Sequence, residues 1–330
     1  MRPVLPWAAL AAAAALGSAV ACGRAHGAAD GAGDDGGDEA GLEAGDDGAV
    51  SPGDDGGSPG QDARPADTGL AGDGGTVTDC DPAASLVYVV SEERFMYSFD
   101  PQKNVIAPVG SVDCAGGSFA NSMSVDRSAV AWINYGDGSL WKVDTKKPAC
   151  VATTFEPNQQ GVGLFGMAFA TKTAGGTTEQ LFIDDLNGNG LGYIDTTTLT
   201  LQLFGPLSGS LAGRIAELTG TGDARLFGFF AGSPLGDGGA AEVAQIDPNT
   251  ETALATYPLP SVDTGSDWAV TFWGGDFYLY TADKYDANAP DTNITRFRPS
   301  DGSLTVVDTQ IGFRAVGAAS STCAPTTPAQ

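Results

Sequence analysis

The order of hydrophobic and polar residues changes at residue 80, after which short apolar runs alternate with Gly, Asp and Pro. Such punctuation is typical of many short β-strands. One alternating run that closes on a polar residue recurs five times, at 97–100, 141–144, 192–195, 244–247 and 295–298. The last residues of these runs are 44, 51, 52 and 51 positions apart. A strand repeat of this length predicts the blades of a β-propeller.

Further strands are expected around each copy of this run. A more apolar strand precedes each copy, at 86–90, 130–134, 181–184, 226–230 and 277–282. An outer strand follows each copy, at 105–109, 151–155, 199–203, 253–257 and 304–308. An innermost strand opens four of the five sets, at 122–125, 165–170, 214–219 and 268–272.

The set that begins at Leu86 has no innermost strand, whereas residues 313–319 form a lone strand of this type at the far end. The simplest arrangement lets this last strand complete the first blade. We therefore predict an all-β fold for residues 80–330, a five-bladed β-propeller closed by the C-terminal strand. Ring closure removes the two free sheet edges that an open array would leave.

Three segments carry a resemblance to a known group of proteins. They are Phe-Ala-Asn-Ser-Met-Ser-Val-Asp-Arg at 119–127, Ala-Glu-Leu-Thr-Gly-Thr-Gly-Asp at 216–223 and Ser-Ser-Thr-Cys-Ala-Pro at 320–325. With them, the chain from Cys80 resembles secreted or lipid-anchored β-propellers of the NHL, SMP-30 and YVTN kind, above all the uncharacterised propeller lipoproteins of myxobacteria. These motifs are structural, so the resemblance implies a fold and no catalytic residue.

The first residues have the pattern of an export signal, with Arg2 ahead of an apolar run over 7–16 and small residues before Cys22. The run is too short to span a bilayer. The sequence Ala-Val-Ala-Cys at 19–22 resembles a bacterial lipobox, which implies removal of a signal peptide, 1–21, and lipidation of Cys22. Two or three acyl chains hold a protein stably on a membrane. The alternative is an ordinary secretory signal that is cut after Ala21.

Residues 22–79 are rich in Gly, Ala, Asp, Ser and Pro, and residues 23–79 carry a net charge of −12. Such a segment cannot bury enough apolar surface to fold, so we expect a disordered acidic tether. Asp-Asp-Gly recurs in it at 34–36, 46–48 and 54–56. Calcium binding is the alternative interpretation, but the irregular spacing favours a solvated linker. His26, the only histidine, lies in this segment.

Four cysteines remain besides Cys22, an even number that favours two disulfides in an exported chain. Three connectivities are open, together with free thiols, and the blade register selects one. Cys80 precedes the first strand of the first blade and Cys323 follows the strand that completes it, whereas Cys114 and Cys150 bracket the second blade. The expected pairs are Cys80–Cys323 and Cys114–Cys150.

The charge and the histidine count exclude several functions. A net charge of −25 repels phosphate backbones, so we predict no nucleic-acid partner. The predicted propeller has no histidine, which excludes a Ser-His-Asp triad, a His-ligated zinc site and a histidine general base. Carboxylates remain, and these serve in calcium binding and in glycoside hydrolysis.

Asp185, Asn187 and Asn189 are the candidate metal ligands. The segment 185–190, Asp-Leu-Asn-Gly-Asn-Gly, matches the first six positions of a calcium loop, although position twelve is Thr196 instead of Glu. Asn and Gly are also what a tight hairpin requires, and we favour the turn. We therefore predict no cofactor, with calcium as the alternative.

Glu217, Arg214 and Trp268 are the candidate ligand-binding residues, all on predicted innermost strands. Side chains there point to the central channel or into the packing between blades. A carboxylate in the channel makes Glu217 the first candidate for a polar contact, and the alternative is a Glu217–Arg214 pair or a hydrogen-bonded contact between blades. Trp268 and Trp273 suit stacking on a sugar, and the alternative for them is the core between blades.

Together these features favour a binding or interaction module rather than an enzyme. We expect it outside the cytoplasm, lipid-anchored to the outer or inner membrane of a Gram-negative bacterium. A rigid ring presents loops on two faces, which suits recognition of an envelope protein or glycan by a monomer. The alternative is a carboxylate- or calcium-dependent hydrolase, similar to a glycosidase or a lactonase.

Overall fold

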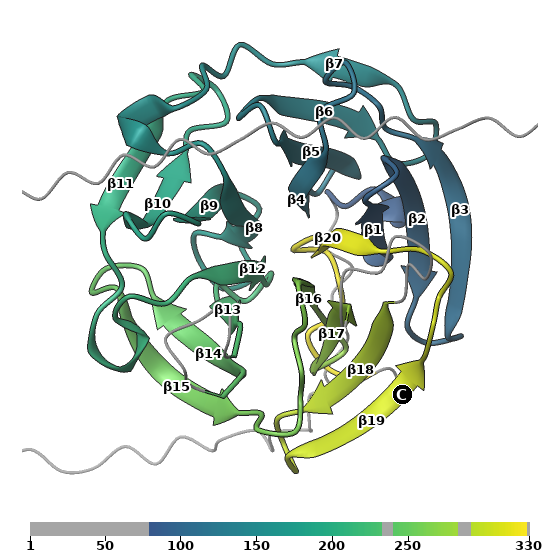
Figure 1. Ribbon diagram of the computed structural model, residues 1–330, viewed down its shortest axis with the longest axis vertical. Helices are drawn as coiled ribbons and strands as arrows, with labels where there is room; N and C mark the ends of the chain where they lie inside the picture. The colour runs from purple at the N-terminus through teal and green to yellow at the C-terminus, as the bar shows by residue number, and fades with distance from the viewer. Residues whose placement is uncertain (1–78, 233–239, 283–291, 329–330) are drawn as a thin grey trace, which may run out of the picture. The chain divides into compact units, whose positions relative to one another are not determined.

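Five four-stranded antiparallel sheets surround a common axis in the computed structural model, which describes residues 79–232, 240–282 and 292–328 (Figure 1). From the innermost to the outermost strand, the blades are A, with β20 (Ala315–Ser320), β1 (Val87–Ser91), β2 (Phe95–Asp100) and β3 (Val105–Ser111); B, with β4 (Ala120–Val125), β5 (Val130–Tyr135), β6 (Leu140–Asp144) and β7 (Cys150–Ala152); C, with β8 (Phe165–Thr171), β9 (Glu179–Asp185), β10 (Gly190–Ile194) and β11 (Leu201–Gly205); D, with β12 (Ala216–Gly220), β13 (Leu226–Phe230), β14 (Glu242–Asp247) and β15 (Thr252–Pro258); and E, with β16 (Asp267–Trp273), β17 (Asp276–Ala282), β18 (Asn293–Arg298) and β19 (Ser303–Asp308). The predicted all-β, five-bladed propeller is confirmed.

The C-terminal strand closes the ring as predicted. β20 pairs with β1 in antiparallel register, with Val87 opposite Ser320 and Tyr88 opposite Ala319. Figure 1 shows β20 beside β1, so that blade A combines the two ends of the folded domain. Three short 3-10 helices, η1 (Pro82–Ser85), η2 (Gln159–Gly161) and η3 (Gly209–Leu211), lie between strands. None of the helices in the described ranges is long and apolar enough to cross a membrane.

Four strand predictions extend by two residues or more beyond the strands of the structure. The outer strand expected at 199–203 is β11, two residues later, and the closing strand expected at 313–319 begins at Ala315. The outer strand expected at 151–155 ends at Ala152, because Thr153 bonds through its hydroxyl to the Leu140 carbonyl and Phe155 turns into the core. The inner strand expected from residue 214 begins at Ala216. Arg214 lies before β12, because its guanidinium binds acceptors on the far side of blade D.

The hydrophobic core is divided into five clusters, one between each pair of neighbouring blades. The cluster between A and B contains Tyr88 and Met123, and the cluster between B and C contains Trp132 and Met167. The other three fill the C–D, D–E and E–A interfaces. Because both faces of each blade are covered, residues of the inner strands are buried on both sides of the strand instead of alternating between buried and exposed. β8 and β12 are buried along their whole length.

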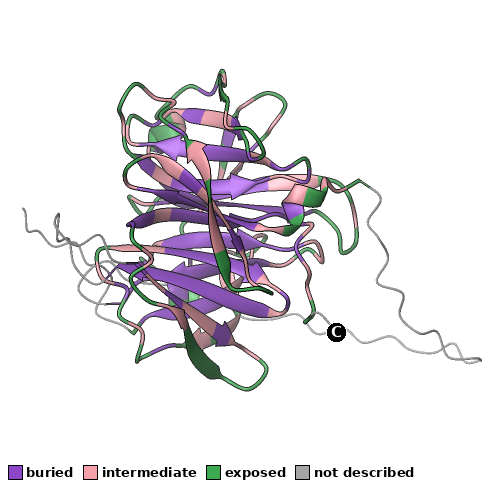
Figure 2. Cartoon of the chain, turned by 90° about the vertical axis from the view of Figure 1, so that its right-hand side faces the viewer, coloured by how far each residue is buried: buried purple, intermediate pink, exposed green. Residues whose placement is uncertain are grey.

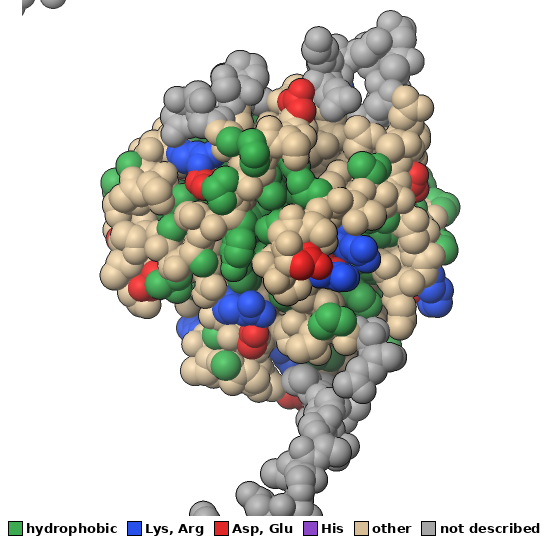
Figure 3. All heavy atoms as spheres, turned by 90° about the horizontal axis from the view of Figure 1, so that it is seen from below, with side chains coloured by type: hydrophobic (Ala, Val, Ile, Leu, Met, Phe, Trp, Pro, Cys, Tyr) green, Lys and Arg blue, Asp and Glu red, His purple; other side chains and the backbone are tan. Residues whose placement is uncertain are grey.

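The outer strands are more exposed, as Figure 2 shows when the ring is seen edge-on. Seven large hydrophobic side chains in the described ranges are exposed, and six of them lie on outer strands, at least one in each blade: Val105, Val151, Phe204, Leu254, Leu304 and Val306. Figure 3 views the rim from the side of β15 and β19, where hydrophobic groups lie among polar and charged ones. The seventh side chain, Phe119, precedes the inner strand β4.

The ring has two unlike faces. We call the face at which the inner strands begin the mouth face, and the face at which they end the closure face. The inner strands approach closely: a Cβ atom on Gly166 would lie 2.1 Å from the Ala216 carbonyl oxygen, and one on Gly220 would lie 2.2 Å from that of Phe169. Glycine is therefore required at both positions, where β8 and β12 of neighbouring blades pack backbone against backbone.

Two disulfides fasten the ring, with the pairing that the register predicts. Cys80 and Cys323 are joined on the closure face across a sequence separation of 243 residues. Cys114, in the connection from blade A to blade B, is joined to Cys150 at the start of β7. The disulfides are compatible with a location outside the cytoplasm.

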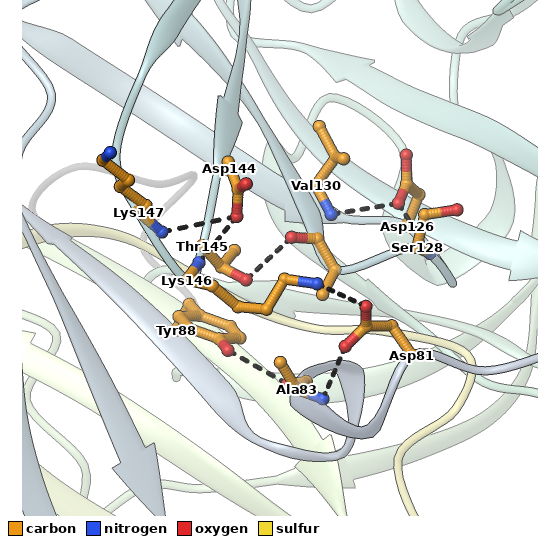
Figure 4. A network of polar contacts seen from close by, with 11 residues as sticks. Asp81, Ala83, Tyr88, Asp126, Ser128, Val130, Asp144, Thr145, Lys146 and Lys147 are labelled. Atoms are coloured by element: carbon orange, nitrogen blue, oxygen red, sulfur yellow. Dashed lines mark hydrogen bonds and ion pairs between the residues drawn. The ribbon is translucent and has the colours of Figure 1, made fainter.

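Polar contacts hold the start of the domain on the closure face (Figure 4). Asp81 accepts a hydrogen bond from the Ala83 amide, which caps η1, and forms a 2.6 Å ion pair with Lys146 of blade B. The Asp81 amide donates to the Arg127 carbonyl. The chain therefore joins the ring on the closure face. The predicted signal peptide, lipidated Cys22 and acidic tether lie outside the described residues.

A second network on the closure face joins three blades. Glu179, at the start of β9 in blade C, accepts hydrogen bonds from the Arg127 amide of blade B and the Thr322 hydroxyl that follows β20 of blade A. Arg127 also donates to Thr322 over 3.2 Å. Burial raises the pKa of Glu179 to about 7, against the lowering effect of its two hydrogen bonds.

Candidate functional site

A hollow of about 280 Å³ opens on the mouth face, and we call it the mouth hollow. Its lining comes from the innermost strands of four blades and lies on the ring axis. The strand residues that line it are Ala120 and Asn121 of β4, Glu217 of β12, Asp267 and Trp268 of β16, and Val316 of β20.

A larger hollow, of about 430 Å³, lies between blades C and D. The ionisable residues that line it, Lys172 and Asp247, are not buried. Asp247 is engaged by Asn249 of its own turn. The mouth hollow is the better candidate site, because a buried ionisable group borders it.

Glu217 forms the floor of the mouth hollow. It is the second residue of β12 and is 5% exposed. Its Oε2 accepts a 2.7 Å hydrogen bond from the hydroxyl of Ser122 on β4, across the channel. This is the only bond of its carboxyl group among the described residues. Burial holds the pKa of Glu217 well above its usual range, against the hydrogen bond from Ser122, and the nearby charge of Asp184 raises it further.

Asp184 lies behind this floor, on β9 of the neighbouring blade. It is 1% exposed, and its Oδ2 accepts a 2.8 Å hydrogen bond from the Ala216 amide at the start of β12. Its Oδ1 has no partner among the described residues. Burial raises the pKa of Asp184 to about 7, opposed by the Ala216 bond, with a further contribution from the charge of Asp185. The hollow therefore rests on two coupled carboxyl groups in a medium of low polarity.

An arginine organises the acidic rim of the hollow. Arg314, immediately before β20, is 2% exposed and binds Asp267 through Nη1. The same nitrogen donates to the Ser266 hydroxyl over 2.8 Å, and Nε lies 3.7 Å from the Glu92 carboxylate. The rim carboxylates of Asp267 and Glu92 are thus paired, unlike that of Glu217.

Aromatic groups form part of the wall. The Phe119 side chain is 51% exposed, and its ring covers Gly136, where a Cβ atom would lie 2.2 Å from the ring. Trp268 lines the hollow and packs against the D–E core. Trp273, at the other end of β16, donates from Nε1 to the Ser85 carbonyl and packs in the E–A cluster. The two tryptophans therefore do not share one stacking site.

Of the three predicted ligand-binding residues, Glu217 and Trp268 are brought together and Arg214 is not. Arg214 pairs with Glu242 of β14 and donates from Nη2 to the carbonyls of Ala231 and Ala240. It does not contact the Glu217 carboxyl, whose bond goes to Ser122. The Arg214 side chain points to the β13–β14 side of blade D, so the Glu217–Arg214 pair is not formed. The other form of that alternative, a hydrogen-bonded contact between blades, is what Ser122 and Glu217 make.

Asp185, Asn187 and Asn189 form the hairpin between β9 and β10. Asp185 is fully buried, and its carboxylate accepts hydrogen bonds from the Asn189 amide and the Asn189 side chain, at 3.1 and 2.6 Å. The Asn187 side chain donates to the same carboxylate over 3.5 Å. This is a self-contained turn. In the described ranges, no group of three His, Cys, Asp or Glu residues is arranged to hold a metal ion.

Several residues of the site were not found by sequence reasoning: Phe119, Asp184, Asp267, Arg314 and Glu92. Phe119 immediately precedes β4, and Arg314 immediately precedes β20. Glu92 follows β1. In a propeller these positions share one face, so the repeat register itself was the signal that could have identified most of them. Asp184 carries no such signal, because it is an acidic residue at the end of an otherwise ordinary apolar strand.

No protein-family model matches this chain, and no curated protein matches it in sequence. Solved structures resemble it weakly. Hydrazine synthase of Kuenenia stuttgartiensis is 12% identical with a TM-score of 0.37, covering 69% of this chain and 64% of that one. A protein of unknown function from Bacteroides caccae is 9% identical with a TM-score of 0.41, covering 71% and 97%. The Dos1 propeller is 10% identical with a TM-score of 0.34, covering 71% and 56%.

Proposed function

We propose that the protein is a lipid-anchored binding module of the bacterial cell envelope, which recognises a protein or glycan at the mouth of its channel. The observation that carries this proposal is Glu217, a buried carboxyl that lines an open hollow and has one oxygen without a partner among the described residues. The propeller fold fits an interaction module, because a closed ring holds such groups rigidly.

The anchoring part of the proposal is supported by the lipobox-like sequence at 19–22 and by the two disulfides. Within the described residues, the chain joins the ring on the closure face, the face opposite the mouth hollow. Mass spectrometry of the mature N-terminus tests this part. An acylated Cys22 is expected, and an unmodified chain that begins at Cys22 would contradict it.

Glycoside hydrolysis is the second candidate, because a carboxyl group with a raised pKa is a general acid in such enzymes. That chemistry requires two carboxyl groups on opposite sides of the substrate. In the mouth hollow, Arg314 pairs with both rim carboxylates, and Asp184 lies behind the floor. A single carboxyl with an open oxygen therefore favours binding.

Affinity capture tests the binding function. The purified full chain, in detergent, is incubated with envelope extract with and without calcium, and captured components are identified by mass spectrometry. We expect a component that is retained by wild type and by Glu179→Gln, and lost with Glu217→Gln and Phe119→Ser. No specific capture, together with turnover of a glycan panel, would replace the binding function by the hydrolase.

A further inference from the structure

We propose that the mouth hollow binds a primary ammonium group on an apolar stem, the chemistry of a lysine side chain on a partner protein. This inference rests on the proposed function and names the group that the site recognises. It is carried by three features: the open oxygen of Glu217, the apolar and aromatic wall, and the small volume of the hollow.

The Glu217 carboxylate would be stabilised by a positive charge, and the described residues place none against it. Glu217 is 5% exposed and forms no ion pair among them. The two nearby arginines are engaged elsewhere, Arg314 with Asp267 and Arg214 with Glu242. A buried carboxylate is unfavourable unless it is paired, so a cationic ligand that reaches Glu217 gains a charge-assisted hydrogen bond.

The geometry of Glu217 selects the kind of cation. Oε2 already accepts the Ser122 hydroxyl, so one oxygen remains for a ligand. A guanidinium group prefers to bind both oxygens of a carboxylate side by side, whereas an ammonium group is a compact point charge that needs only one. A lysine side chain therefore fits this floor better than an arginine side chain.

The wall and the volume define the rest of the ligand. Phe119, Leu186, Trp268 and Val316 give the hollow apolar and aromatic sides. Such sides pack against methylene groups, and aromatic faces attract a cation. At about 280 Å³ the hollow is at the lower limit of small-molecule pockets. One extended side chain fits this size better than a glycan chain with several sugar rings.

Binding of an ammonium group is coupled to a proton. Burial keeps the pKa of Glu217 high in the free protein, and Asp184 on β9 acts in the same direction. The other charged groups that border the hollow are Asp267 and Glu92, with Arg314 between them. A cation at Glu217 stabilises its ionised form, so the carboxyl loses its proton to solvent as the ligand binds.

Calorimetric titration of the full chain with n-butylamine at pH 6, in two buffers of different ionisation enthalpy, tests the inference. Wild type should bind the amine with proton release. Glu217→Gln should weaken binding by about 10- to 100-fold, because a charged hydrogen bond is lost, and should abolish the proton release. Glu179→Gln is the matched control, since Glu179 is a carboxyl with a raised pKa on the other face. Glu179→Gln should leave the affinity for n-butylamine and the proton release unchanged.

Further arms define the ligand. Phe119→Ser, which alters an exposed side chain, should weaken binding less than Glu217→Gln does. n-Butanol and butylguanidine should bind more weakly than n-butylamine. A short lysine peptide should compete with the amine, whereas its side-chain-acetylated form and glucosamine should not. Competition by glucosamine instead of the peptide would identify an amino sugar and overturn the lysine assignment.

Equal binding of n-butylamine to wild type and Glu217→Gln, or no binding, would overturn the inference. This outcome is distinguishable from failure of the proposed function. If an envelope component is still captured and lost with Glu217→Gln, only the ammonium chemistry is wrong. If the amine binds with proton release but no component is captured, the recognition function is wrong.

Discussion

The two faces of the ring use the same residue type in opposite ways. On the closure face, both oxygens of Glu179 are occupied, by the Arg127 amide and the Thr322 hydroxyl of two other blades. On the mouth face, Glu217 has one partner within the part of the chain that the structure describes, Ser122, and its second oxygen has none there. A raised pKa is common to both carboxyl groups, so it does not by itself identify a binding site. The number of protein partners distinguishes the structural carboxyl from the one that suits a ligand.

The largest expected effect lies on the closure face. Replacing both Cys80 and Cys323 by Ser should lower the free energy of unfolding by roughly 5 kcal/mol, because the loop that the disulfide closes is nearly the whole domain. Removing Cys114–Cys150, with a separation of 36 residues, should cost roughly 4 kcal/mol. Denaturant unfolding measures both. A larger loss of stability on removing Cys114–Cys150 than on removing Cys80–Cys323 would contradict this prediction.

The pH dependence of stability tests the buried carboxyls of both faces together. The pKa values of Glu179 and Asp184 rise to about 7 on folding, and that of Glu217 rises as well. The folded state therefore holds more protons than the unfolded state. The stability from Glu179 and Asp184 is full below pH 4, is lost as the pH rises towards 7, and is absent above it, and the raised pKa of Glu217 acts in the same direction.

Thermal unfolding should accordingly show a melting temperature that falls between pH 5 and pH 8. Each pKa unit corresponds to about 1.4 kcal/mol, and Glu179 and Asp184 each contribute over roughly two units between pH 5 and their pKa of about 7, so the change amounts to about 5 kcal/mol. Asp184→Asn should flatten the curve, because it removes one titrating group. A melting temperature that rises over this range would show that the two faces do not hold protonated carboxyls.

A pair of isosteric variants separates the faces directly. Glu179→Gln should cost about 1–3 kcal/mol at pH 8, because glutamine has one acceptor oxygen where Glu179 accepts a hydrogen bond on each of its two oxygens. Glu217→Gln should change stability by less than about 0.5 kcal/mol or increase it, because its single acceptor bond is kept and a buried charge is removed. Urea unfolding of both variants measures this. Equal losses would mean that Glu217 is structural too.

The smallest effect is expected at the rim of the mouth. Phe119→Ser should alter the free energy of unfolding by no more than about 0.5 kcal/mol, because the side chain is half exposed. The same change in Trp132, which is 2% exposed in the B–C cluster, should cost about 3–5 kcal/mol. Parallel unfolding curves provide the comparison. A large loss for Phe119→Ser would assign the ring to the core and not to the site.

The order of blades and the pairing of cysteines could be predicted because both follow from the repeated pattern of apolar and polar residues along the chain. The five alternating runs that end on a polar residue predicted the strand order. The lone inner strand near residue 315 predicted that the C-terminus completes the first blade and closes the ring. Arg214 was misplaced because its partner Glu242 lies 28 residues away on another strand. Asp184 was missed because its effect on Glu217 arises between blades, and pairing between blades leaves no trace in the alternation of one strand. The repeat register places Arg314 and Asp267 on the mouth face, but their pairing, which also runs between blades, leaves no such trace.

The construction of blade A has a mechanical consequence. A force applied to the chain ahead of Asp79 would act along η1 and β1, and without a covalent tie it would peel β1 from β20 one hydrogen bond at a time. The Cys80–Cys323 bond transfers that load to the C-terminal strand before it reaches β1. Pulling then strains the whole blade against its neighbours B and E, which resists far more than a single sheet edge. The disulfide thus protects the pairing of β1 with β20 from a force applied where the chain enters blade A.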